Sequence, residues 1–362
     1  MLVHPALIAH GNPRNVFIAG GGEGATAREV LRHASVERCL MVDIDRVVCD
    51  FCEEHLEANR AAFADPRLEL VCDDAAAQLR AAPDGAFDVI VGDLADPVAG
   101  GPCFQLYTRE FYETVVRRKL APGGIFVTQS GPCGVLSATQ VFTPIHHTLA
   151  AVFARVVPMA AHVPSYADTW GWNVAFLDEE PEAAAANRTA PNGNGVPKKS
   201  PTAALLRGRM PATADEADAA LSAALPSGHE LVFLDGSGLM GALALNKIVR
   251  RAIAEEDHVY TVDSPCVEFF FFLVSSSSPR RSIVVSSPLR FLSLTFCCPL
   301  VLFPLPPFRT LKIQALHSWR GNSDDRQLMT REREENRKKT IAISQKVCCF
   351  VCFSFKLSYF CL

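Results

Sequence analysis

Two carboxylates at the end of one apolar run are the residues of this chain best suited to chemistry. The segment FDVIVGDLADPVAGGPC, residues 87–103, places Asp93 directly after the run and Asp96 three residues later. Carboxylates are common proton acceptors in general acid–base catalysis, so two of them in one place suggest such a role. The glycines that follow indicate a loop beside them. The alternative is a simple turn, since Asp-Pro often starts one.

A glycine-rich segment earlier in the chain predicts a binding site for a nucleoside. In NVFIAGGGEGATAREVL, residues 15–31, glycines that include Gly20, Gly22 and Gly24 lie between a strand-like and a helix-like stretch. The pattern G-x-G-x-x-A is the nucleotide-binding fingerprint, and Asp43 follows about 20 residues on, at the end of MVDID. Such glycines let the backbone approach a ligand, and the acid accepts hydrogen bonds from ribose hydroxyls. A tight turn with close packing is the alternative.

Glu23 lies inside this loop and narrows the choice of ligand. Its carboxylate would repel the pyrophosphate of a dinucleotide, and equally the carboxylate of S-adenosylmethionine. It suits a ligand that carries an ammonium group instead. The loop therefore points away from NAD and, more weakly, from an ordinary methyl donor.

Composition and cysteine usage favour a cytoplasmic protein that acts on a small molecule. The 362-residue chain has a formal net charge of −4, which gives no general reason to expect nucleic acid and fits a cationic small molecule better. The start shows no signal peptide, and the six cysteines before residue 260 are scattered as reduced thiols. Cys49 and Cys52 form a C-x-x-C without a second pair, so we expect no metal or redox site there.

The elements that must position these residues alternate between strand-like and helix-like stretches. This alternation is typical of an α/β fold: a doubly wound, mostly parallel sheet with helices on both faces, Rossmann-like and similar to S-adenosylmethionine-dependent methyltransferases. The predicted strands are 16–19, 39–44, 68–72, 87–91, 125–128 and 173–177, and the predicted helices are 25–33, 47–59, 107–119 and 137–153.

Changes in composition divide the chain into four parts. They are a catalytic domain at 1–178, a disordered insert at 179–212, the C-terminal part of the domain at 213–262, and an unstructured tail at 263–362. Within the third part we expect a helix at 215–225, a strand at 230–234 and a helix at 239–255. The apolar run 291–308 is interrupted by prolines, so no membrane helix is expected there.

Several stretches together resemble one family, the aminopropyltransferases, which include the spermidine and spermine synthases. The resemblance is strongest to the plant thermospermine synthase branch and covers residues 1 to about 262, apart from the insert. The stretches that carry it are GGGEGATAREVLRH, MVDID, VGDLADPVAGGPCFQLYTREFY, KLAPGGIFVTQSGP, HVPSYADTWGW and LNKIVRRAIAEEDHVYT.

The resemblance implies a reaction between a polyamine and decarboxylated S-adenosylmethionine, which is a co-substrate and not a cofactor. The aminopropyl group passes to an amine, so that spermidine becomes thermospermine, and methylthioadenosine leaves. This donor lacks a carboxylate and carries an ammonium group, in agreement with the argument from Glu23. The resemblance implies no metal, nucleic acid or membrane, and family members usually pair as homodimers.

The resemblance also implies roles for single residues. Asp93 accepts the proton of the attacking amine, and Asp96 holds a cationic amine or raises the basicity of Asp93. On the donor side, Gly20, Gly22 and Gly24 form the nucleoside loop, Asp43 holds the ribose, Asp74 and Ala75 meet the adenine, Glu23 holds the ammonium group, and Pro102 lies in the loop over the adenosine. On the acceptor side, Tyr107, Gln129 and Tyr166 line the polyamine channel, while Trp170 and Trp172 stack on the substrate.

Other functions stay open beside this one. They are a spermidine or spermine synthase, a methyltransferase on the same fold, and a catalytically impaired family member. The last alternative follows from two departures. The family's N-terminal β-hairpin domain, with a donor-contacting Gln and a Tyr-His-Glu motif, has no counterpart before MLVHP, and the family's C-terminal residues are replaced from about Ser264. We therefore expect an N-terminally truncated chain with an aberrant tail.

Overall fold

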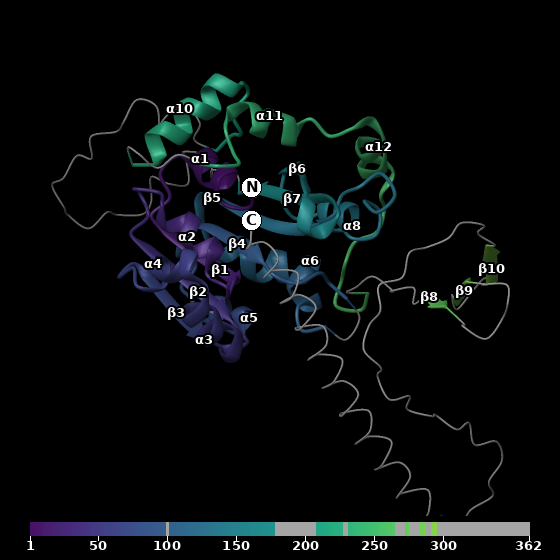
Figure 1. The fold of residues 1–362 in the computed structure, drawn as a ribbon, viewed down its shortest axis with the longest axis horizontal. Helices are drawn as coiled ribbons and strands as arrows, with labels where there is room; N and C mark the ends of the chain where they lie inside the picture. Colours follow the sequence, from purple (N-terminus) through teal and green to yellow (C-terminus); the bar gives the residue numbers. More distant parts are fainter. Residues whose placement is uncertain are drawn as a thin grey trace, which may run out of the picture. The chain divides into compact units, whose positions relative to one another are not determined.

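A seven-stranded sheet forms the centre of the structure (Figure 1). The computed structural model describes residues 1–98, 101–177, 208–226 and 231–264, together with three short strands between residues 272 and 294. The strand order is β3-β2-β1-β4-β5-β7-β6; β1 to β5 run parallel, and β7 runs antiparallel to β5 and to β6. The strands are β1 (Asn15–Gly20), β2 (Arg38–Asp43), β3 (Leu68–Cys72), β4 (Phe87–Asp93), β5 (Leu120–Pro132), β6 (Arg155–Val163) and β7 (Asp168–Phe176). The predicted doubly wound, mostly parallel sheet is confirmed.

Short helices connect and flank these strands. They are α1 (His4–His10), α2 (Ala25–Leu31), α3 (Arg46–His55), α4 (Arg60–Phe63), α5 (Ala75–Ala81), α6 (Arg109–Phe111), α7 (Arg117–Lys119), α8 (Phe142–Ala150), α10 (Ala214–Ala224), α11 (Gly236–Leu243) and α12 (Lys247–Glu255). Single turns of 3-10 helix lie at Glu57–Asn59, Phe104–Tyr107 and Pro164–Tyr166, and a π-helical segment, Tyr112–Val116, joins α6 to α7.

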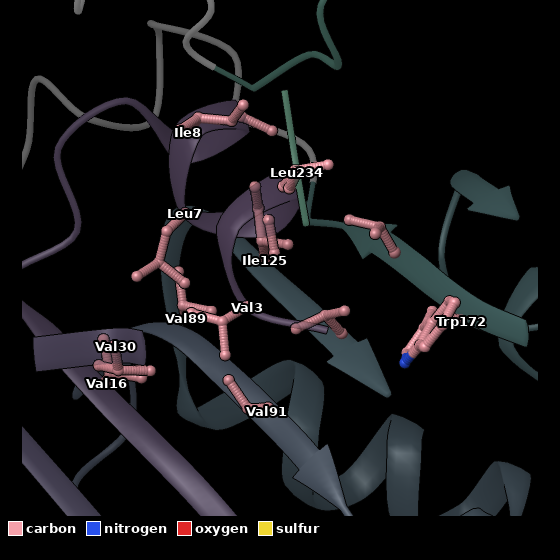
Figure 2. Close-up of a cluster of buried hydrophobic side chains, with 14 of the residues drawn as sticks. Val3, Leu7, Ile8, Val16, Val30, Val89, Val91, Ile125, Trp172 and Leu234 are labelled. Atoms are coloured by element: carbon pink, nitrogen blue, oxygen red, sulfur yellow. The ribbon is translucent and has the colours of Figure 1, made fainter. Parts of the chain in front are cut away.

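Helices cover both faces of the sheet because alternate strand residues are apolar on both sides. In β1, Val16 and Ile18 belong to one buried cluster, whereas Phe17 and Ala19 belong to another. The first cluster, part of which Figure 2 shows, includes side chains of α1, α2, α10 and α11. The second includes side chains of α5, α8 and the helical segment 104–119. The two clusters hold the sheet rigid between them.

The predicted strands of the central sheet agree with the structure except at one edge. The edge strand β6 was not predicted, because RVVPMAAHV does not alternate and contains Pro158. An edge strand tolerates proline because one side of its backbone has no partner strand. Among the helices, α1, α4 and α5 were not predicted, and the helix expected at 137–153 begins only at Phe142.

The C-terminal part of the domain differs from two predictions. A single helix was expected at 239–255, but α11 ends at Leu243 and α12 begins at Lys247. Asn246 explains the break, because its side chain accepts a hydrogen bond from the Val249 N–H at 3.0 Å and so caps the second helix. Residues 231–234 of the strand expected at 230–234 are irregular, and residue 230 lies outside the described residues.

The insert and the tail lie largely outside the described residues. Residues 208–212, which we assigned to the disordered insert, belong instead to the folded part: the Gly208 N–H donates to the Ala9 carbonyl at 2.9 Å, and Arg209 pairs with Glu216 at 3.0 Å. Within the predicted unstructured tail, β8 (Phe272–Val274), β9 (Ile283–Ser286) and β10 (Phe291–Leu294) form a small antiparallel sheet. Antiparallel pairing satisfies the backbone groups of these short apolar stretches. Across the described ranges, no helix has the length and apolarity needed to cross a membrane.

Candidate active site

The topology brings most of the predicted site residues to one edge of the sheet. Because β1 to β5 are parallel, their carboxyl ends meet there, which is where open α/β sheets bind ligands. Gly20, Asp43 and Asp93 end β1, β2 and β4. The antiparallel β7 begins at the same edge, since Trp170 pairs with Pro132 at the end of β5. The 3-10 turn that contains Tyr166 lies beside it, between β6 and β7.

The glycine loop packs directly against Asp93. Gly20 is the register partner of Asp93 and has a φ of +82°, in the left-handed region. A Cβ on Gly20 would lie 2.2 Å from the Asp93 carbonyl oxygen, so only glycine fits. The glycine loop and Asp93 are therefore neighbours through the β1–β4 pairing, although 73 residues separate Gly20 from Asp93 in the sequence.

Asp43 ties the end of β2 to the same loop. Its Oδ2 accepts a hydrogen bond from the Gly22 N–H at 2.8 Å, and its Oδ1 accepts one from the Asp45 N–H at 2.9 Å. A Cβ on Gly22 would lie 2.7 Å from Asp43 Oδ2 and 2.9 Å from Cys49 Sγ. The carboxylate thus fixes the loop that was predicted to bind the nucleoside. The contact of Asp43 with a ribose stays a prediction.

The Asp93 side chain is held by a residue that sequence reasoning missed. Thr26, in the first turn of α2, donates from Oγ1 to Asp93 Oδ2 at 2.8 Å. A Cβ on Gly21 would lie 3.2 Å from the same carboxylate oxygen. The sequence does show a hydroxyl in the helix that follows β1. The β1–β4 pairing that brings this hydroxyl to Asp93 is seen only in the structure.

Gln129, near the end of β5, is the centre of a buried polar network. Its Nε2 lies 2.6 Å from the Leu94 carbonyl oxygen, 3.0 Å from Asp96 Oδ1 and 3.1 Å from the Tyr107 hydroxyl. These three acceptors share the two hydrogens of one amide group. Its Oε1 accepts from the Trp170 indole N–H at 3.1 Å and from a backbone N–H. Gln129 therefore sets the position of Asp96 and Trp170, and a direct contact with a polyamine stays a prediction.

Burial affects the ionisation of two groups in this network. It raises the pKa of Asp96, although the amide of Gln129 opposes the shift by donating to the carboxylate. It also raises the pKa of Tyr107 well above its ordinary value, with the nearby Asp96 charge acting in the same direction. Tyr107 is only 1% exposed and packs in the second apolar cluster, and its contact with a polyamine stays a prediction.

The remaining acceptor-side residues differ in their exposure. Tyr166 is half-buried, and its ring lies 4.2 Å from that of Trp170, centroid to centroid. Ala167, directly after Tyr166, has a φ of +54°, which is unusual for a residue other than glycine. Trp172 is only 7% exposed and lies in the first apolar cluster (Figure 2), where its large apolar ring packs in the core; its stacking on a substrate stays a prediction.

The predicted donor-side residues lie around the ends of β1, β3 and β4. Asp74 caps α5 by accepting from the Ala76 N–H at 2.7 Å, and Ala75 is buried beside it. Glu23 is 9% exposed, and its backbone carbonyl accepts from the Asn59 side chain at 2.6 Å. Pro102 is exposed in the loop after β4. Their contacts with a donor stay predictions.

The cysteines of the described residues form no disulfide with one another. Cys49 and Cys52 are buried on α3, where burial raises the pKa of Cys49. Among the residues that the structure describes, no three His, Cys, Asp or Glu side chains are grouped as metal ligands.

Taken as chemistry, this edge combines a loop suited to a nucleoside with two carboxylates suited to an amine. Asp93 packs against the loop, and Asp96 belongs to the network of Gln129. A carboxylate placed between a bound electrophile and a cationic nucleophile can accept a proton and hold the two in line.

Comparisons with known proteins agree with this reading. The sequence profile of the spermine/spermidine synthase domain matches residues 1–187. Thermospermine synthase ACAULIS5 of Arabidopsis thaliana is 42% identical over 263 residues, which is 73% of this chain and 68% of that protein. A polyamine aminopropyltransferase of Aeropyrum pernix is 39% identical over 264 residues, covering 73% and 74% of the two chains. The solved structure of spermidine synthase from Thermotoga maritima has the same fold, with a TM-score of 0.54 over 71% of this chain and 74% of that chain at 24% identity.

Proposed function

The chain belongs to the spermine/spermidine synthase family, and from this premise we propose that it transfers the aminopropyl group of decarboxylated S-adenosylmethionine to spermidine. The observation that carries the proposal is the packing of the Asp93 carboxylate against Gly21 of the glycine loop, with Thr26 of the following helix donating to it at 2.8 Å. This contact supports a base that stands next to the bound donor. The products are then thermospermine and methylthioadenosine.

The proposed chemistry is a single in-line displacement. An acceptor amine gives up a proton to Asp93. Its freed lone pair then attacks the methylene carbon of the aminopropyl group that is bonded to the sulfonium sulfur. The N–C bond forms as the C–S bond breaks, and methylthioadenosine leaves with the electron pair. Asp93 removes the proton because a protonated amine has no lone pair, and the fixed geometry lowers the entropic cost of bringing the reactants together.

The charges around the site support a cationic acceptor and an unusual donor. Asp96 attracts a second positive charge of the polyamine, and the half-buried position of its carboxylate strengthens that attraction. Glu23 in the glycine loop favours a donor with an ammonium group and no carboxylate. This charge disfavours the alternative of an S-adenosylmethionine-dependent methyltransferase.

The choice of spermidine as acceptor and thermospermine as product follows the relative from Arabidopsis thaliana, at 42% identity. A spermidine or spermine synthase is the alternative within the family. We also propose a cytoplasmic location, supported by the free thiols of the described residues, and the pairing into homodimers stays a prediction.

One assay tests the function. The purified chain is incubated with decarboxylated S-adenosylmethionine and spermidine, and the polyamines and nucleosides are separated by chromatography. We expect methylthioadenosine and a tetraamine in equal amounts, with thermospermine distinguished from spermine by a reference compound. Transfer of a methyl group in a parallel incubation with S-adenosylmethionine would support a methyltransferase instead. No turnover, with nucleoside binding intact, would support a catalytically impaired family member.

The base is tested by Asp93→Asn, which keeps the size of the side chain and removes its basicity. We expect kcat to fall by about 10²–10⁴-fold, the range of general-base contributions. Asp50→Asn, on the exposed face of α3, is the control and should leave kcat unchanged. Full activity of Asp93→Asn would exclude this residue as the base.

A further inference from the structure

The Thr26 hydroxyl forms a bond that its own helix does not require. Within helices, Thr side chains commonly bond back to the backbone of the preceding turn. Thr26 instead donates across to β4, to Asp93 Oδ2 at 2.8 Å. The N-cap of α2 is Gly24, which makes no side-chain capping bond. The hydroxyl is therefore used to hold a carboxylate and not to begin the helix.

The surroundings of this bond favour its strength. Thr26 is only 7% exposed, so water competes little for its hydroxyl. The same carboxylate oxygen lies against Gly21, 3.2 Å from where a Cβ of that residue would be. A hydrogen bond to an ionised group in a place with little water is stronger than one at the surface. Together, the hydroxyl and the glycine backbone restrict rotation of the Asp93 carboxylate.

From these contacts we infer that Thr26 is a positioning residue, which joins the donor-binding loop to the base. This inference rests on the proposed function. Thr26 follows Gly24 by two residues, so the loop that would hold the donor also fixes the hydroxyl that orients Asp93. The base is then aligned for an amine when the nucleoside loop is in its binding conformation. Thr26 itself exchanges no proton with the substrate.

The test compares two substitutions that differ in the hydroxyl. Thr26→Val keeps the shape of the side chain and removes the donor, whereas Thr26→Ser keeps the donor and removes a methyl group. We measure kcat and the KM for spermidine at saturating donor, and the Kd of methylthioadenosine by calorimetry. Thr114→Val, which removes an exposed hydroxyl on the helical segment after α6, is the matched control.

We expect Thr26→Val to lower kcat about tenfold to a hundredfold, as the loss of one hydrogen bond to a charged group predicts. KM and the nucleoside Kd should stay within about twofold, and Thr26→Ser should recover most of kcat. In the Asp93→Asn background, Thr26→Val should cause no further loss, because its effect passes through Asp93.

Three results would overturn the inference alone: an unchanged kcat, a rise in the nucleoside Kd as large as the loss of kcat, or no recovery in Thr26→Ser. Such a rise would mean that Thr26 only supports the loop. A wild-type chain that releases no methylthioadenosine with spermidine, putrescine or spermine would overturn the proposed function itself, and the inference with it. The wild-type assay is done first, so the two failures are distinguished.

Discussion

At the scale of single residues, burial acts on the ionisation of the Asp96 carboxylate. It must be ionised to hold an ammonium group, and burial favours its neutral form. Gln129 counters that effect by donating to Oδ1 at 3.0 Å. This hydrogen bond favours the charged form of a carboxylate whose burial strengthens its attraction for a cation.

This balance predicts a pH dependence of acceptor binding. Burial raises the pKa of Asp96 above its ordinary value. As the pH falls, its carboxylate is therefore neutralised earlier than that of a solvated aspartate. We expect the KM for spermidine to rise as the pH is lowered from neutrality, while the Kd of methylthioadenosine changes little. Steady-state kinetics over this range would measure it.

Asp96→Asn is the control for that prediction. Its KM should be high throughout and independent of pH over the same range, because the amide does not titrate. If the acidic rise in KM persisted in Asp96→Asn, another group would be responsible and the assignment to Asp96 would be wrong.

At the scale of elements, the glycine loop is shaped by the strands on either side of it. Its first glycine meets the Asp93 backbone, and Gly22 meets the Asp43 carboxylate from β2. Three neighbouring strands therefore leave no room for side chains in the loop. Close packing of this kind lets the backbone approach a nucleoside without a change in conformation.

Substitution of Gly22 by alanine tests this packing. The added Cβ would lie 2.7 Å from Asp43 Oδ2 and 2.9 Å from Cys49 Sγ, so the loop must shift. We expect the Kd of methylthioadenosine to rise by at least about tenfold, equivalent to about 1.4 kcal/mol, in calorimetric titrations.

Gly241→Ala is the matched control, since a Cβ at that position of α11 meets nothing within 4 Å. It should leave the nucleoside Kd unchanged and raise the free energy of unfolding by about 0.5–1 kcal/mol, as Gly→Ala does within helices. Equal nucleoside affinity in the two variants would show that the loop tolerates a side chain at Gly22.

At the scale of the whole molecule, a buried histidine pair joins α1 to the end of α2. The His4 Nδ1 and the His33 Nε2 lie 2.9 Å apart, and the His4 Nε2 bonds to Glu29 at 2.9 Å. Burial lowers the pKa of His33 to about 3 and also lowers that of His4. Both rings are 4% exposed or less, so the pair contributes to the core as neutral groups.

The pair predicts acid sensitivity of the fold. An unfolded chain protonates His33 near its ordinary pKa of 6.5, whereas the folded chain does so only near 3. Below pH 6.5 the unfolded state therefore binds more protons, and the stability falls as the pH falls towards 3. We expect His33 to account for a loss of about 3 kcal/mol between pH 6.5 and 4, measured by urea unfolding.

His33→Gln should make the stability less dependent on pH in that range, because glutamine can replace the hydrogen bond but does not titrate. His162→Gln, at an exposed position of β6, is the control and should keep the wild-type dependence. An unchanged slope in His33→Gln would mean that other groups cause the acid sensitivity.

The sequence by itself determined the fold class and predicted residues that the sheet brings to one edge. Periodic apolar runs identified β1 to β5, and their alternation with helices predicted that these strands are parallel. Parallel strands end at the same edge of the sheet, which places Asp43 and Asp93 there. Glycine spacing likewise located the loop. These features are local in the chain, so local patterns were enough to find them.

Only the tertiary structure decided which side chains meet. The bond from Thr26 to Asp93, the network of Gln129 and the burial of Trp172 all join residues from different strands and helices. Similarly, β6 is a strand because β7 lies beside it, although its own residues do not alternate. The physical reason is that hydrogen-bond partners and burial depend on register and packing between elements, which no pattern along a single segment records.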